Sequence, residues 1–189
     1  MQIELNGTTF SLEGDGNPVA TALRTALLAN GATASGGELP DLLILSFPLL
    51  PAEGADAGPL LARAEEAGAA MFERGHGRIL CLVSAIAGMP MRRHAGFSLR
   101  MAGVVTSVRT LAMRLGPHVL INAVGAGAVG EPLVAGDGAM LSHAAVKRPG
   151  SIAEVVDTAL FFADPLNTYT TGQMLAVDGG WSVGYGRNF

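Results

Sequence analysis

The sequence is poor in several residue types on which catalysis often depends. Of its 12 basic residues only Lys147 is a lysine, and Cys81 is its single cysteine. Tyrosine occurs only at Tyr169 and Tyr185, and residues 31–121 contain no asparagine. One cysteine excludes a disulfide within the chain, so a reducing compartment is expected.

Charge is scarce as well, and its distribution excludes whole classes of function. Charged residues make up 15% of the chain, the net charge is −4, and no basic run exists, so nucleic-acid binding lacks electrostatic support. No apolar stretch approaches the roughly 18 residues that span a membrane. The residues after Met1 show no secretory signal, and we therefore expect a cytoplasmic protein.

The remaining composition is typical of a buried sheet covered by alanine-rich helices. The chain has 189 residues, is 49% hydrophobic and contains 26 glycines, which predicts a single domain over residues 1–189. Hydrophobic periodicity predicts strands over 8–13, 41–47, 79–83 and 119–124, and helices over 18–29, 59–74, 98–115 and 152–163. The four histidines are scattered and predict no metal site.

The most informative stretch runs from residue 77 to residue 101. An apolar strand ends on Ser84, Phe97 follows thirteen positions later, and Met101 comes four residues after that. This layout resembles the active-site segment of the short-chain dehydrogenase/reductase family. In that family a catalytic serine at a strand end precedes a tyrosine and a lysine in a Y-x-x-x-K motif. Phe97 stands at the tyrosine position and Met101 at the lysine position.

The tail from Tyr169 to Trp181 is nearly identical to the closing strand of the same family. The resemblance implies a Rossmann-like, doubly wound parallel α/β sheet. It also implies that helices 59–74 and 98–115 and segment 152–185 are subunit interfaces, because the family assembles through the corresponding elements.

The turn after the first strand occupies the place of the family's dinucleotide fingerprint. Gly14 matches the first glycine of that fingerprint, whereas Pro18 and Ala20 replace the second and third. Such a turn binds pyrophosphate through backbone N–H groups, and proline has none. We expect an ordinary helix start capped by Asn17, with a surviving nucleotide site as the alternative.

A second departure from the family follows the first helix. Only residues 33–40 separate that helix from the strand at 41–47, whereas the family has a further strand-helix-strand unit there. Such a unit needs about 30 residues. The fold is therefore expected to be shortened, and this chain is expected to bind no cofactor.

The residues that survive at the old site leave two interpretations open. Ser84 is either a turn residue or a nucleophile, and a nucleophile would need a base such as His94. Arg92 and Arg93 are either a solvated loop pair or a reader of an anionic group. No catalytic residue of the family motif other than Ser84 remains in place.

Together these features predict a degenerate family member that does not catalyse the reaction by itself. We expect a non-catalytic subunit of a hetero-oligomer whose active partner is a paralogous dehydrogenase. The partner would bind NAD(P), and its implied substrates include hydroxyacyl or ketoacyl thioesters. The alternatives are an enzyme of altered chemistry that uses Ser84, and a homo-oligomeric binding or regulatory protein.

Overall fold

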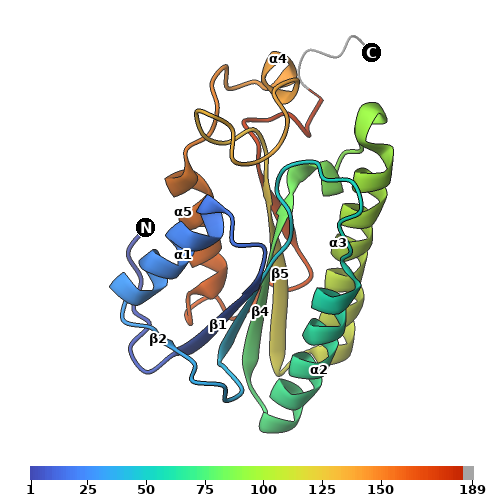
Figure 1. Ribbon diagram of the computed structural model, residues 1–189. Coiled ribbons are helices and arrows are strands. Elements are labelled where there is room, and N and C mark those ends of the chain that lie inside the picture. Colours follow the sequence, from blue (N-terminus) through green and yellow to red (C-terminus); the bar gives the residue numbers. More distant parts are fainter. Residues whose placement is uncertain (185–189) are drawn as a thin grey trace.

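The computed structural model describes residues 1–184 and shows a six-stranded, all-parallel sheet with helices on both faces (Figure 1). The strand order is β2-β1-β3-β4-β5-β6. The strands are β1 (Thr9–Gly14), β2 (Thr33–Ala34), β3 (Leu42–Ser46), β4 (Gly77–Ser84), β5 (Val119–Ala126) and β6 (Met174–Val177). The α-helices are α1 (Pro18–Ala29), α2 (Gly58–Arg74), α3 (Ala95–Leu115), α4 (Met140–His143) and α5 (Ile152–Ala163).

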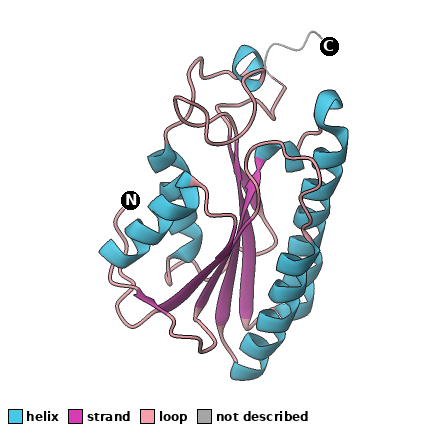
Figure 2. Ribbon diagram, viewed as in Figure 1, coloured by secondary structure: helices cyan, strands magenta, loops and turns pink. Residues whose placement is uncertain are grey.

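The helices cover the two faces of the sheet as two separate layers. Figure 2 shows α1 and α5 together on one face and α2 with α3 on the other. All five residues of β3 are buried, as expected for a parallel strand covered on both faces. The predicted Rossmann-like α/β fold is confirmed.

Helix α3 is held to the sheet by the apolar stripe that the sequence predicts. The buried stripe repeats at helical spacing and comprises Met101, Val104, Val105, Val108, Leu111, Ala112 and Leu115. The helix begins at Ala95, three residues before the predicted start, so Phe97 lies within it. The helix therefore presents both Phe97 and Met101 to the core.

The segment between α1 and β3 keeps a remnant of a further strand. Thr33 and Ala34 form β2, which pairs in parallel with Thr9 and Phe10 of β1. The sequence analysis assigned no strand to residues 33–40, and in this detail it was wrong. Two residues are too few to show a periodic pattern, and only pairing with β1 identifies them.

The other boundaries differ from the predictions in small ways. The closing strand β6 has only four residues, and the last residue of the predicted interface segment, Tyr185, lies outside the described residues. The short helix α4 was not predicted. Within residues 1–184, no helix is both long and apolar enough to cross a membrane.

Candidate functional site

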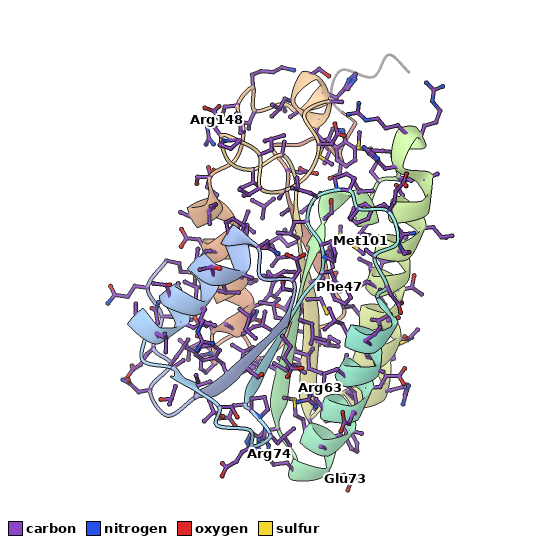
Figure 3. The ribbon with its side chains drawn as sticks, in the orientation of Figure 1. Phe47, Arg63, Glu73, Arg74, Met101 and Arg148 are labelled. Atoms are coloured by element: carbon purple, nitrogen blue, oxygen red, sulfur yellow. The ribbon has the colours of Figure 1, made fainter. Side chains whose placement is uncertain are left out.

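The three positions that correspond to the family's catalytic residues lie at the carboxyl end of β4 and the start of α3. Ser84 is fully buried, and its Oγ has no hydrogen-bond partner among residues 1–184. Phe97 is 4% exposed and Met101 is 1% exposed. Figure 3 shows Met101 between α3 and the sheet. General acid–base catalysis needs a titratable group at the reacting atom, and neither side chain offers one.

Phe97 and Met101 belong to a continuous apolar cluster. The same cluster includes Ala128, Met140 and Trp181, which come from the segments after β5 and β6. Side chains from three distant parts of the chain thus belong to one apolar cluster. Phe97 and Met101 are both buried within it.

The backbone of the fingerprint turn lies in close contact with the end of β3. Gly14 has φ +104°, and a Cβ at this position would lie 2.3 Å from the carbonyl oxygen of Ser46. The same oxygen accepts a hydrogen bond of 2.7 Å from the backbone N–H of Asp15. Only glycine fits such an approach with a positive φ.

The start of α1 is capped from within the chain. The Oδ1 of Asn17 accepts from the backbone N–H of Ala20 at 3.0 Å, and its Nδ2 donates to Ser46 Oγ at 2.9 Å. Pro18 occupies the first helical position and has no N–H. The predicted cap is confirmed, and it occupies a donor that a pyrophosphate would otherwise use.

The acidic side chain beside this turn is paired with a cation from α2. The Nε of Arg63 lies 3.1 Å and 3.3 Å from the two carboxylate oxygens of Glu13. Both side chains are about one-third exposed. Because the two charges cancel, the pair gives no net positive field to a phosphate at this turn.

Residues 127–139, here called the strap, contact the loop after β3, next to the boundary between β1 and β3. In a doubly wound sheet the strand order reverses at this boundary, which is the topological switch point where dinucleotides bind. The strap folds back on itself through a hydrogen bond from Val129 N–H to the carbonyl of Ala135, and both residues are fully buried. They share an apolar cluster with Ala20 of α1 and Leu49 after β3.

A backbone hydrogen bond and an ionic contact hold the strap in place. The N–H of Gly136 donates to the carbonyl of Leu49 at 2.9 Å. The carboxylate of Asp137 lies 2.7 Å from His94 Nε2 and also pairs with Arg93. The backbone of Leu49 and the two residues before α3, Arg93 and His94, thus bind the strap.

These contacts test the roles considered above for Ser84, His94 and the pair Arg92 and Arg93. His94 bonds to Asp137, and Ser84 has no partner among the described residues, so no Ser84–His94 pair is present. Arg93 is ion-paired, whereas Arg92 is exposed. Asp137 was not identified from the sequence, since it lies 44 positions from Arg93 and no local pattern connects them.

Among residues 1–184, no cluster of three or more histidine, cysteine, aspartate or glutamate side chains is arranged to hold a metal ion. The lone thiol of Cys81 lies within β4, where burial raises its pKa to about 12. Cys81 is therefore protonated at neutral pH and is a packing residue of the sheet.

Comparison with known proteins places the chain in a family. A family model described as enoyl-(acyl carrier protein) reductase matches residues 58–182. Short-chain reductase protein NovJ of Streptomyces niveus is 35% identical over 123 residues, covering 58% of this chain and 47% of that protein. The (2S)-[(R)-hydroxy(phenyl)methyl]succinyl-CoA dehydrogenase subunit BbsD of Thauera aromatica is 32% identical over 119 residues, covering 60% and 48%.

Solved structures support the same fold. The 3-oxoacyl-[acyl-carrier protein] reductase of Brucella melitensis superposes with a TM-score of 0.77 at 17% identity, covering 95% of this chain and 92% of that one. The chain belongs to the short-chain dehydrogenase/reductase family. It spans about half the length, or less, of the curated relatives it matches (39% to 51%).

Proposed function

We propose that this chain is a non-catalytic member of an oxidoreductase family, which assembles with an active short-chain dehydrogenase and stabilises or completes it. The proposal places NAD(P) in the partner subunit and none in this chain. Its central support is the state of the two replaced catalytic positions, Phe97 and Met101, which are buried in the apolar core.

The burial of Phe97 and Met101 distinguishes this proposal from simple loss of two reactive groups. A vacated site would leave both positions open to water. Instead, Phe97 is 4% exposed and Met101 is 1% exposed within the core cluster, and Asp137 and Leu49 bind the strap. A cofactor would have to displace packed apolar side chains at a cost of about 25 cal/mol for each Å² returned to water.

The surfaces that would bind the partner are those that the family resemblance indicates. Residues 98–115 carry two strongly exposed apolar side chains, Leu99 and Met113, at 76% and 78%. Segment 152–185 carries further exposed apolar side chains, including Leu166 at 88% and Tyr169 at 99%. Exposed apolar groups of this size favour a protein partner when they are grouped.

The names of the relatives suggest the chemistry of the complex. One relative is named as a subunit of a (2S)-[(R)-hydroxy(phenyl)methyl]succinyl-CoA dehydrogenase, and others are named as a 2,4-dienoyl-CoA reductase and a 3-oxoacyl-[acyl-carrier-protein] reductase. We therefore assign the complex to the reduction or oxidation of an acyl thioester.

An enzyme that uses Ser84 gains no support from the geometry, since the hydroxyl is buried without a base.

Co-expression tests the proposal directly. The chain and the short-chain dehydrogenase encoded nearest to it are expressed together and separately, and each preparation is analysed by native mass spectrometry and by turnover of a hydroxyacyl thioester. We expect a defined complex whose activity or thermal stability exceeds that of the dehydrogenase alone. A dehydrogenase that is fully active alone, beside a chain that purifies only with itself, would refute the proposal.

A further inference from the structure

A cleft of about 310 Å³ opens between the loop after β3 and the beginning of α3. One wall is residues 51–54, and the other comprises residues 93–97 together with Arg100. Two arginines of α3 and its approach, Arg93 and Arg100, line the cleft, and among the described residues only Arg93 has a carboxylate partner.

Arg100 differs from Arg93 in that its hydrogen-bond partner is a neutral backbone carbonyl. Its Nη2 donates to the carbonyl of Ala52 at 2.8 Å, which is the only hydrogen bond it makes among the described residues. Its Nε is shielded from water and has no hydrogen-bond partner among residues 1–184. A shielded cationic donor without an acceptor is costly in free energy, and no described residue supplies the missing acceptor.

The other half-buried or paired arginines of the described chain show how such a charge is normally satisfied. Arg78 donates to three backbone carbonyls at the end of α5. The rest have a carboxylate, in the pairs Arg63–Glu13, Arg74–Asp41, Arg93–Asp137, Arg114–Glu65 and Arg148–Glu154. Arg100 has one neutral acceptor and forms no ion pair among the described residues, although Glu53 lines the same cleft.

We propose that the cleft binds an anionic group, a carboxylate or a phosphate, through the guanidinium of Arg100 with Arg93 beside it. A guanidinium offers parallel N–H donors that match two oxygens of such a group. The positive end of α3 points toward the same wall and adds to the field. The cleft includes Phe97, and Arg100 lies within residues 98–115, which are proposed above to bind the partner, so the site is tested on the chain without a partner.

Glu53 on the opposite wall sets a limit on the ligand. It is exposed and forms no ion pair among the described residues. Its charge opposes any anion in the cleft, so the ligand binds with its anionic group at the Arg100 side. Removing the charge of Glu53 strengthens binding, whereas removing that of Arg100 weakens it.

The test is a titration of the full chain with inorganic phosphate and, separately, with succinate. Binding is followed by calorimetry at constant ionic strength, with chloride as the reference salt. We expect one saturable site for at least one of the two anions and a loss of about tenfold or more with Arg100→Gln. Binding to one anion alone identifies which of the two sources of negative charge the cleft accepts.

Matched variants separate a built site from general screening. Arg109→Gln removes an exposed arginine of the same helix and should leave the affinity within about twofold, while Glu53→Gln should raise it. Arg100→Lys keeps the charge but loses the paired donors, and circular dichroism checks that each variant is folded. The proposal is wrong if neither anion saturates by about 50 mM, or if Arg100→Gln and Arg109→Gln weaken binding equally.

Discussion

Replacing Met101 by lysine restores the residue type that the family motif has at this position, and the burial of this position predicts that the change destabilises the protein and does not activate it. Met101 is 1% exposed and lies among apolar side chains of the core between α3 and the sheet. Phe97, one turn earlier in α3, has no carboxylate that could pair with a lysine at position 101. A lysine here must lose its proton or expose its ammonium to water by opening the core.

The size of the effect follows from the protonation of the new lysine. Buried lysines titrate at a pKa of about 5–6, against about 10.4 in water. At pH 7 the buried amine is therefore neutral. Removing the proton of a lysine whose pKa in water is about 10.4 costs about 4–5 kcal/mol at pH 7, since each of the roughly 3.4 units between them is about 1.4 kcal/mol. That is a large part of the 5–15 kcal/mol by which domains are usually stable.

The pH dependence gives a second signature. The pKa of the lysine is depressed in the folded state, so between that pKa and about 10.4 the unfolded state binds more protons and stability rises with pH. The deficit of Met101→Lys should shrink by about 1.4 kcal/mol per pH unit from pH 7 to 9. Urea unfolding at several pH values measures it, and Met101→Leu, with a cost below about 1.5 kcal/mol, is the control.

A small, pH-independent deficit for Met101→Lys would refute this reasoning. It would mean that the position faces water or a polar cleft, as a working active site does. The interpretation of Phe97 and Met101 as core residues would then fail with it.

Three further predictions test other parts of the structure. The thiol of Cys81, whose pKa is raised to about 12 by burial, should react with a thiol reagent only as the chain unfolds in urea; labelling of native protein would contradict its placement. The hydrogen bonds from Arg148 and then from the Ser151 N–H lower the pKa of Glu154 to about 2, so its stabilising effect is present above pH 4.5 and lost as pH falls toward 2. Glu154→Gln should therefore lower the Tm at pH 7 but not near pH 2, and an equal loss at both would contradict the pairing. Asp137→Asn should raise amide exchange in the strap about tenfold without changing exchange in β4, measured by mass spectrometry; unchanged exchange would show that the ionic contact does not hold the strap.

Much of the fold could be predicted from the sequence because its elements have strong local signals. The stripe of α3 and the run of β3 follow hydrophobic periodicity, and the Asn17-Pro18 pair marks a helix start by its capping chemistry. Phe97 and Met101 were assigned to the family's tyrosine and lysine positions because the segment resembles the family motif. Their burial follows because apolar side chains on a helix that packs against a sheet face inward.

The remainder depends on contacts between residues distant in the sequence. The strap is joined to the start of α3 through Asp137, and α2 is joined to the fingerprint turn through Arg63 and Glu13. No local sequence pattern around these residues indicates their partners. The sparse contacts of Arg100 could not be foreseen either, because they depend on where the loop at Ala52 lies.

Binding of nicotinamide nucleotides to the isolated chain tests the central claim most directly. Calorimetric titration with NADH and NADPH up to millimolar concentration should show no saturable heat, because the start of α1 is capped by Asn17 and lacks an N–H at Pro18, and the strap is bonded to Leu49. Saturable binding with a micromolar dissociation constant would contradict the account.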